Sequence, residues 1–495
     1  MAVASTRNLM MSIGAVLALS ACGGGADRVA SPGEGAFPPA PAPAPAPGPA
    51  PAPAPAPAPG PVAGCPTGFS DVGTIAGKTN CRLPALIVEN TTVPYVDGVL
   101  YSISGYTRVG EDVGGDAANP RANQRSATLT IEPGVTIFGS SGQDALVVNR
   151  GSKINAVGEK TKPIVFTSRQ SVEGTTNVDS IGQWGGLVLL GRAPTANCIG
   201  SVTPGTAACE AEVEGVTGAY YGGNAPGDST GTLKYVRVMH SGFEVLPNVE
   251  LNGITLAGLG SGTSIEYVQV HNSSDDGFEW FGGTVNNRYL VATGNDDDSI
   301  DTDTGFAGAI QFAIVMQRGQ KAASGDRGDR INEMSAAGSS ALPSNPKLVN
   351  VTFVGAPAHD RSAMVLNSGT HVEYYNAVVT GSNNCAEIDT AGNANTRGTF
   401  ASVFFSCGAP FHNDAAGTQL AAFTANANNV ANGTSSLSGF TNGANENAVA
   451  AADLSGLITR SGGFVRQVNY IGAVKDSNDT WWQGWTCGLP GTPSC

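Results

Sequence analysis

Two stretches of the chain repeat each other at an offset of 22 residues: Tyr267-Val-Gln-Val-His-Asn-Ser-Ser-Asp-Asp-Gly-Phe-Glu279 and Tyr289-Leu-Val-Ala-Thr-Gly-Asn-Asp-Asp-Asp-Ser-Ile-Asp301. In this alignment tyrosine matches tyrosine, a pair of aspartates matches a pair of aspartates, and an apolar residue followed by an acidic one recurs at the end. A short repeat with alternating apolar positions is typical of a solenoid whose coils stack as parallel sheets. The repeat therefore predicts an all-β fold, a right-handed parallel β-helix with capped ends, in which equivalent side chains form ladders.

Alternation within each coil indicates which side chains face inwards. The expected inward positions are Val236 and Val238, Val268 and Val270, Leu290 and Ala292, and Phe312 and Ile314; Arg237, Gln269 and Val291 are expected on the outer face. Further strands are expected at 127–138, 144–150, 163–168, 184–190, 233–239, 348–354, 375–380 and 400–406. Bulky residues are needed to cover the ends of a solenoid. We expect the segment 65–81 to cap one end and the cluster Trp481, Trp482 and Trp485 to cap the other, with 413–460 as a looser, weakly helical insertion.

The first 64 residues have a different composition from the rest. Residues 9–21 are apolar, follow Arg7 and are too few to span a bilayer, which is typical of a secretory signal. They end in Leu19-Ser20-Ala21-Cys22, which resembles a bacterial lipobox. We therefore expect residues 1–21 to be a lipoprotein signal peptide, Cys22 to be the lipidated N-terminus, and Gly23 to direct sorting to the outer membrane. An ordinary signal peptide with a coincidental cysteine is the alternative.

A proline-rich segment separates this leader from the remaining sequence. From Pro38 to Pro61 the chain is almost entirely proline and alanine, which favours an extended polyproline II conformation. At about 3.1 Å per residue such a segment reaches on the order of 75 Å. We expect residues 22–64 to be a lipidated stalk and 65–495 to be the β-helix domain.

The nine cysteines fit an exported protein. Without Cys22 they form four pairs of near neighbours, and we expect four local disulfides: Cys65–Cys81, Cys198–Cys209, Cys385–Cys407 and Cys487–Cys495. A zinc site is the alternative, but no pair has the Cys-x-x-Cys spacing that zinc sites commonly show.

The charge of the chain excludes some classes of partner. The net charge is −14 and only 13% of residues are charged, while 67 residues are glycine. A nucleic-acid surface is basic, so we expect no nucleic-acid binding.

Several stretches resemble a family of secreted and lipoprotein β-helix proteins that is widespread in Bacteroidetes and proteobacteria. They are Leu129-Thr-Ile-Glu-Pro-Gly134, Trp184-Gly-Gly-Leu-Val-Leu-Leu-Gly191, Gly231-Thr-Leu-Lys-Tyr-Val-Arg237, Gly260-Ser-Gly-Thr-Ser-Ile-Glu-Tyr-Val-Gln-Val270, Ser274-Asp-Asp-Gly-Phe-Glu-Trp-Phe-Gly-Gly283, and Tyr470-Ile-Gly-Ala473 followed by Gly484-Trp485-Thr486. The resemblance covers roughly 65–495. It implies an envelope role, often beside TonB-dependent receptors, and no established enzymatic activity.

The acidic rungs of the repeat are the main candidate for chemistry. They comprise Asp275, Asp276 and Glu279 on one coil and Asp297, Asp298 and Asp301 on the next, with Asp296 and Asp303 close by. Adjacent strands lie about 4.8 Å apart, and two carboxylates at that spacing repel by roughly 3.5 kcal/mol at an effective dielectric constant of about 20. Bound Ca²⁺ would relieve this repulsion, because it accepts six to eight oxygen ligands in flexible geometry. The alternatives are carboxylates that accept hydrogen bonds from turn N–H groups, or another ion such as Mg²⁺.

A catalytic use of the acidic rungs is the second hypothesis. β-Helix polysaccharide lyases neutralise a uronate with Asp-bound Ca²⁺ and abstract a proton with an arginine or lysine. Arg288 precedes the second coil, and Arg327 and Arg330 follow it, so Arg288 and Arg330 are candidate bases. Fold alone does not establish such an activity.

Together these observations predict a non-catalytic lipoprotein of the outer membrane, facing the periplasm or the cell surface. Its expected partner is a glycan, a surface polymer or a TonB-dependent receptor. A calcium-dependent lyase or glycoside hydrolase, and a purely structural spacer or adhesin, are the alternatives. A buried acidic ladder closed off by neighbouring turns favours the binding protein. The same ladder in an open groove, with Arg288 or Arg330 pointing into it, favours the enzyme.

Overall fold

The computed structural model divides the chain into two units, Met1–Ala58 and Pro59–Cys495, and the residues that it describes all lie in the second unit. They are 64–247, 249–317, 332–334, 341–356, 362–391, 393–412 and 416–495. The expected signal peptide, Cys22, Arg327, Arg330 and all of the expected stalk except Gly64 therefore lie outside the described residues.

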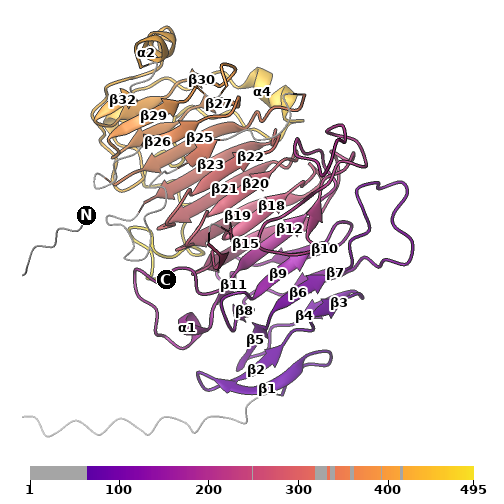
Figure 1. Ribbon diagram of the computed structural model, residues 1–495. Helices are drawn as coiled ribbons and strands as arrows, with labels where there is room; N and C mark the ends of the chain where they lie inside the picture. Colours follow the sequence, from indigo (N-terminus) through magenta and orange to yellow (C-terminus); the bar gives the residue numbers. More distant parts are fainter. Residues whose placement is uncertain are drawn as a thin grey trace, which may run out of the picture. The chain divides into compact units, whose positions relative to one another are not determined.

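The second unit is an all-β parallel β-helix, as the repeat predicts (Figure 1). Apart from the antiparallel pair β1–β2, the strands of its two large sheets pair in parallel. The first sheet has 17 strands: β1 (Ser70–Ile75), β2 (Lys78–Arg82), β4 (Thr91–Val93), β5 (Val99–Ile103), β7 (Thr128–Ile131), β8 (Thr136–Gly139), β10 (Lys153–Val157), β11 (Ile164–Ser168), β15 (Gly231–Met239), β19 (Ser264–His271), β21 (Asn287–Thr293), β23 (Ala309–Met316), β25 (Lys347–Val354), β27 (His371–Tyr375), β28 (Val378–Thr380), β30 (Arg397–Ala401) and β31 (Phe404–Ser406).

The second sheet has 11 strands: β3 (Leu86–Ile87), β6 (Tyr106–Val109), β9 (Ala145–Val148), β12 (Gly186–Leu190), β18 (Ile254–Ala257), β20 (Phe278–Phe281), β22 (Ile300–Asp303), β24 (Asn332–Met334), β26 (Ser362–Leu366), β29 (Asn384–Ile388) and β32 (Ala409–Phe411). Two small hairpins, β13 (Ala211–Glu212) with β14 (Tyr220–Tyr221) and β16 (Glu244–Leu246) with β17 (Val249–Glu250), stand apart from both sheets. Four short helices complete the described part of the chain: α1 (Arg169–Val172), α2 (Ala416–Thr424), α3 (Ala444–Asn447) and α4 (Ser455–Arg460). None of these is a long apolar segment of the kind that crosses a bilayer.

Four long strands of the first sheet, β15, β19, β21 and β23, each turn a corner at an aromatic residue. β15 pairs with β10 along its first half and with β11 along its second half, and Tyr235 between the two halves has a φ of 50°. The same left-handed φ occurs at Tyr267, Tyr289 and Phe312. This conformation is unfavourable for a bulky L-residue. Stacking of the four rings in sequence, with centroid separations of 4.6, 4.4 and 5.0 Å, helps to offset that cost.

The 22-residue offset is confirmed, but the next coil is longer by one residue. Phe278 pairs with Ile300 and Glu279 with Asp301, as the alignment predicts. In the following coil, however, Leu290 pairs with Ala313 rather than with Phe312. The expectation that Phe312 and Ile314 point inwards is therefore wrong: Phe312 continues the aromatic corner, and Ile314 lies on the outer face beside Val291.

Both ends of the coil stack are covered, although one cover differs from the prediction. At the first end, the β1–β2 hairpin carries the Cys65–Cys81 disulfide, and Phe69 packs edge-on against Tyr101 with centroids 5.1 Å apart. At the other end, α2 places the buried ring of Phe423 on that of Phe405 at 4.6 Å. The tryptophan cluster does not cap this end.

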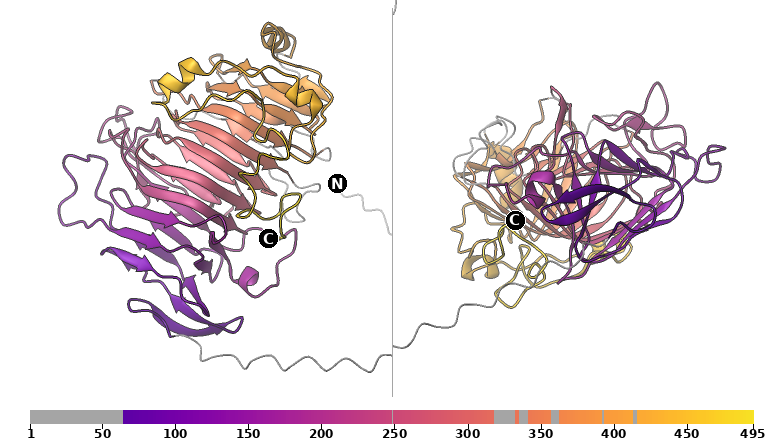
Figure 2. Two further views of the ribbon diagram at one scale, coloured as in Figure 1. Left: turned by 180° about the vertical axis from the view of Figure 1, so that it is seen from behind. Right: turned by 90° about the horizontal axis from the view of Figure 1, so that it is seen from below.

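The C-terminal strap, residues 440–495, runs back along the outside of the first sheet (Figure 2). Three outward amides bind its backbone. Gln311 exchanges hydrogen bonds with Arg466 at 2.8 and 2.9 Å, and Gln269 exchanges them with Cys487 at 2.7 and 3.0 Å. Asn350 donates to the carbonyl of Tyr470 at 2.9 Å.

The tryptophans belong to this strap and cover the side of the central coils. Trp485 packs edge-on against Tyr235 and Tyr267, with centroids 6.0 Å from each. Trp481 packs against Tyr289 at 5.1 Å. The apolar end that we expected these rings to cover is already filled by α2, so they instead bury the aromatic corner of the first sheet.

The expected disulfides are all present. The bonded pairs are Cys65–Cys81, Cys198–Cys209, Cys385–Cys407 and Cys487–Cys495. Each closes a loop of the β-helix unit, as the short spacings predict.

Candidate functional site

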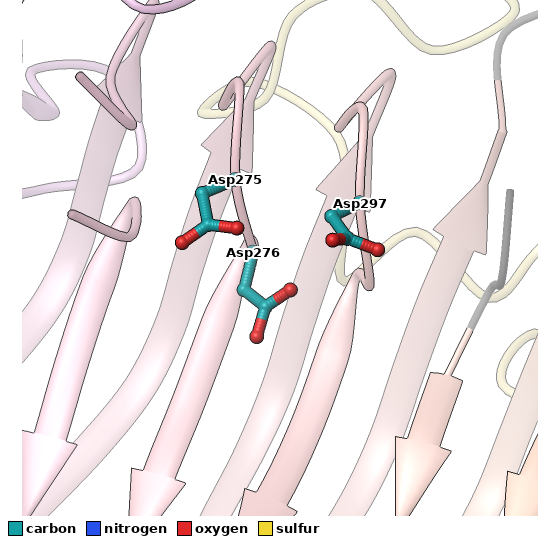
Figure 3. A group of neighbouring side chains, drawn as sticks. All are labelled: Asp275, Asp276 and Asp297. Carbon is teal, nitrogen blue, oxygen red and sulfur yellow. The ribbon is translucent and has the colours of Figure 1, made fainter. Parts of the chain in front are cut away.

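The acidic rungs lie at consecutive turns that lead into the second sheet (Figure 3). Asp275 and Asp276 lie in the turn before β20, and Asp297 and Asp298 occupy the equivalent turn before β22. The carboxylate oxygens form two groups of three in which all three ligand atoms lie within 4.8 Å of one another. The first group contains Asp275, Asp276 and Asp297, and the second contains Asp276, Glu279 and Asp301. Asp276 is common to both groups, which we call the acidic triads.

Asp298, the sixth predicted residue, joins the triads through its backbone. Its N–H donates to Oδ1 of Asp276 at 3.0 Å, and its side chain is buried. The structure therefore brings five of the six predicted residues into the two triads and places Asp298 beside them; the sequence did not indicate that the triads share Asp276.

Burial makes these carboxyl groups resist ionisation. Desolvation raises the pKa of Asp275, Asp276 and Glu279 well above the usual range, and neighbouring carboxylates raise the same pKa values further. The neighbouring carboxylate with the largest effect on Asp275 is Asp297, and the one with the largest effect on Glu279 is Asp301. None of Asp275, Asp276 and Glu279 forms an ion pair with a lysine or arginine in the described part of the chain. The cluster is therefore a concentration of negative charge in poorly solvated surroundings.

A side excursion, residues 191–230, covers the outer face of the second sheet near the triads. Val213 and Val216 of the excursion pack with Leu251 and, at the edge of the same cluster, with Phe281 of β20. Glu214 lies between these two valines and acts on Asp275 and Glu279 as a further carboxylate. Burial also raises the pKa of Glu214. The sequence analysis missed Glu214 because it lies outside the repeat and about 60 residues before the triads.

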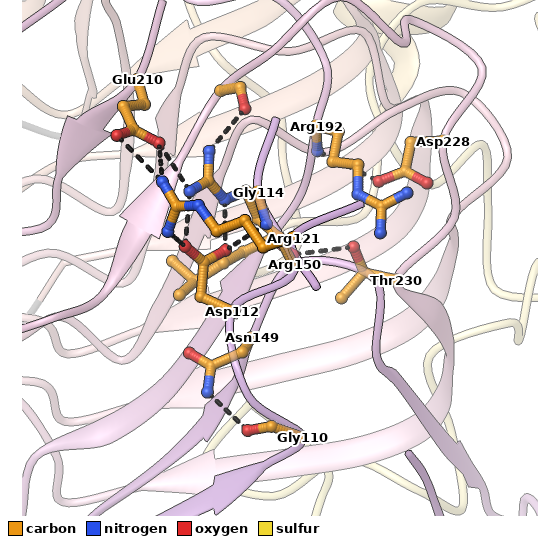
Figure 4. Close-up of polar contacts among 12 residues, drawn as sticks. Gly110, Asp112, Gly114, Arg121, Asn149, Arg150, Arg192, Glu210, Asp228 and Thr230 are labelled. Carbon is orange, nitrogen blue, oxygen red and sulfur yellow. Dashed lines mark hydrogen bonds and ion pairs between the residues drawn. The ribbon is translucent and has the colours of Figure 1, made fainter. Parts of the chain in front are cut away.

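A network of charges holds this excursion in place (Figure 4). The side chain of Arg150 is fully buried and bonds Asp112 at 2.6 Å and Glu210 at 2.7 Å. It also donates to the carbonyl of Gly222 at 3.0 Å. Burial alone would lower the pKa of Arg150, but the bonds and charges of Asp112 and Glu210 outweigh burial and raise the pKa. The excursion that carries Glu214 is thus fixed to the coil behind it.

The triads offer the chemistry that a hard divalent cation requires. All their ligand atoms are carboxylate oxygens, and Ca²⁺ is bound by such oxygens at 2.3–2.6 Å. Asn252 lies beside them, with Nδ2 bonded to Glu279 at 2.5 Å. Its Oδ1 is buried and lacks a hydrogen-bond partner. The residues therefore fit a calcium ion, whose charge would allow the carboxyl groups to ionise.

Neither candidate base is found beside the triads in the described residues. Arg288 lies on β21, in the first sheet, where its guanidinium pairs with Glu266 at 2.6–2.7 Å and lies over the ring of Phe464 at 4.5 Å. Arg330 lies outside the described residues. Arg288 is therefore engaged in an ion pair of its own and does not serve the acidic cluster.

A family model described as a pectate-lyase-like β-helix domain matches residues 119–486, well over half of the chain. The chain belongs to this family of parallel β-helix proteins. No curated protein and no solved structure matched the chain in the corresponding comparisons.

Proposed function

We propose that this protein is a non-catalytic envelope lipoprotein whose β-helix binds a glycan or surface polymer and whose acidic triads hold calcium. The observation that carries the proposal is the burial at the centre of the triads. The side excursion packs on the second sheet beside them, the shared Asp276 is only 7% exposed, and the other four triad residues are half-buried. A cation in such a place stiffens two consecutive coils rather than presenting a reactive centre to a polymer.

The chemistry of the described residues supports binding over catalysis. Proton abstraction beside a calcium-bound uronate needs a base within hydrogen-bond reach of the substrate. Arg288 lies on the first sheet, where it pairs with Glu266 and packs against Phe464 of the C-terminal strap. With calcium bound, the triads would supply positive charge, while the chain's own residues would only position that ion.

The leader supports an outer-membrane location within this proposal. The segment Leu19-Ser20-Ala21-Cys22 provides the lipidation signal, and the Pro-Ala stretch 38–61 provides a spacer between the membrane and the β-helix. A TonB-dependent receptor in the same membrane is the protein partner that we propose. In that arrangement the β-helix would present captured polymer to the receptor.

A calcium-dependent polysaccharide lyase is the second candidate. The observation in its favour is the description of the matching family, which refers to pectate lyase. In this alternative the ion at the triads would bind a uronate carboxylate, and a basic residue would remove the neighbouring proton.

Thermal unfolding combined with a product assay separates these functions. The full chain is stripped with EDTA and unfolded with and without calcium, and the same samples are incubated with polygalacturonate. We expect calcium to raise the melting temperature in a saturable manner, the protein to be retained on immobilised polymer, and no unsaturated product to form. Calcium-dependent formation of unsaturated product would overturn the non-catalytic proposal in favour of the lyase.

A further inference from the structure

A separate cavity of about 440 Å³ lies between the C-terminal strap and the first sheet. Helix α4 forms one wall, where Leu457 packs on Ala309 and Val349. The opposite wall is built from residues at or just before the starts of β19, β21, β23 and β25. The polar residues that line the cavity are Ser261, Thr284, Asn286, Asn345, Lys347, Arg460 and Ser461. None of them belongs to the acidic triads.

Two cations, Arg460 and Lys347, line this cavity, and only Arg460 has a carboxylate bonded to it. Glu373 of β27 is bonded by both terminal nitrogens of Arg460, at 2.8 and 2.7 Å, so this pair is internally neutralised. Lys347 instead donates to the carbonyl of Ala307 at 3.0 Å. The next charged or titratable groups, His371 and Arg397 at the neighbouring strand starts, bond each other at 3.2 Å. Of the two cations that line the cavity in the described part of the chain, Lys347 is therefore the one with no carboxylate bonded to it.

Two polar groups near Lys347 can donate hydrogen bonds to a ligand. Asn286 accepts from the N–H of Ala309 at 2.9 Å through Oδ1, which leaves its Nδ2 directed to no described neighbour. The exposed hydroxyl of Ser261 likewise makes no hydrogen bond to a described residue. A set consisting of an ammonium, an amide N–H and a hydroxyl complements an oxygen acceptor, and most strongly an ionised one. This donor set stands out in a chain with a net charge of −14.

We propose that this cavity binds one anionic oxygen group, a sulfate, phosphate or carboxylate, carried by a sugar-sized ligand, with Lys347 as its counter-charge. The site goes beyond the proposed calcium-dependent function, because it shares no residue with the triads and requires no metal. A single sugar ring is the size of ligand that a cavity of this volume accommodates.

The protonation of Lys347 gives this site a characteristic pH dependence. Burial lowers the pKa of Lys347 to about 8; Glu373 acts to raise this pKa and Arg460 to lower it. A bound anion favours the charged ammonium and raises the pKa again. Binding near pH 8 therefore takes up protons, and affinity falls as the pH rises above 8.

The test is calorimetric titration of the full chain in EDTA with three probes: inorganic sulfate, D-glucuronate and uncharged D-glucose. We expect saturable binding of at least one anion, no binding of glucose, and proton uptake near pH 8. Lys347→Gln should weaken anion binding by roughly tenfold or more. Lys153→Gln, at an exposed lysine elsewhere on the first sheet, is the matched control and should leave binding unchanged.

Ser261→Asp provides a second variant in case Lys347→Gln does not fold. It places a negative charge at the exposed rim of the cavity and should weaken binding of both anions without touching the core. Binding of sulfate alone would identify an inorganic oxyanion as the ligand, and binding of glucuronate would identify an acidic sugar. Equal binding of glucose, no saturable binding of either anion, or unchanged binding in both variants would overturn the proposal. Because EDTA is present throughout, these outcomes do not depend on calcium at the triads.

Discussion

At the scale of single residues, Asp276 is the group on which both acidic triads depend. Asp276→Asn removes an ionisable group but keeps the shape of the side chain. In EDTA we expect the variant to be more stable than the wild type, by roughly 1–3 kcal/mol, because the folded wild type must either protonate this carboxyl group or bury its charge beside like charges. With calcium the order should reverse, because the shared ligand is lost. The measurement is the melting temperature of both proteins with and without calcium.

Asp97→Asn is the control for this prediction, because Asp97 is exposed and lies outside the cluster. It should change neither the metal-free stability nor the response to calcium. An Asp276→Asn variant that is stabilised by calcium as strongly as the wild type would contradict the assignment of both triads.

The raised carboxyl pKa values predict how stability depends on pH without metal. A carboxyl group whose pKa is raised on folding binds its proton more tightly in the folded state than in the unfolded state. The folded protein therefore loses stability as the pH rises from the pKa of the unfolded chain, near 4, through the pKa of the folded state. The EDTA-treated protein should therefore become less stable between about pH 4 and neutrality. Calcium should remove most of this loss, since it stabilises the ionised form. Urea unfolding across this range measures both slopes, and a metal-free stability that rises steadily with pH would count against the prediction.

At the scale of structural elements, the C-terminal strap depends on single amides that point outwards from the coils. Gln269 is fully buried and satisfies both the N–H and the carbonyl of Cys487. Gln269→Ala leaves those two backbone groups without partners, and we expect a loss of about 2–4 kcal/mol. Gln170→Ala, at an exposed glutamine of α1, should cost almost nothing. Urea unfolding gives the energies, and limited proteolysis between 440 and 495 reports whether the strap detaches.

The Cys385–Cys407 disulfide ties β29 to the residue that follows β31, at the far end of the coil stack. Replacing both cysteines with serine should lower the free energy of unfolding by about 3 kcal/mol, because the unfolded chain regains the freedom of a closed loop of this length. The melting temperature should fall, while calcium should still raise it. A variant that no longer responds to calcium would show that this end of the stack and the triads are not independent.

At the scale of the whole molecule, the outer-membrane location that we propose depends on the first residues of the chain. Cys22→Ser removes the proposed lipid attachment, and we expect the protein to move from the membrane fraction to the soluble periplasmic or secreted fraction. Ser20→Ala keeps a small residue in the lipobox and should remain membrane-bound. Cell fractionation with metabolic labelling by palmitate checks both, and a Cys22→Ser protein that stays in the outer membrane would contradict a lipid anchor.

The sequence by itself determined the parallel β-helix, the four disulfide pairs and the proximity of the five acidic residues that form the triads. It could do so because a solenoid places residues one coil apart in direct contact, so that a repeat along the chain is also a contact in space. Phe312 shows the limit of this rule. One additional residue in its coil shifts the register, so that Phe312 lies at the aromatic corner instead of pointing inwards.

Contacts between segments far apart in the chain were decided only by the tertiary structure. The strap brings Trp485 onto Tyr235 and Tyr267, the side excursion brings Glu214 to Asp275, and α4 closes the cavity around Lys347. None of these segments follows the repeat. The periodicity of the sequence therefore does not predict where they pack. Their positions are set instead by the burial of apolar side chains and by hydrogen bonds to outward amides such as Gln269, which form only once the coils have stacked.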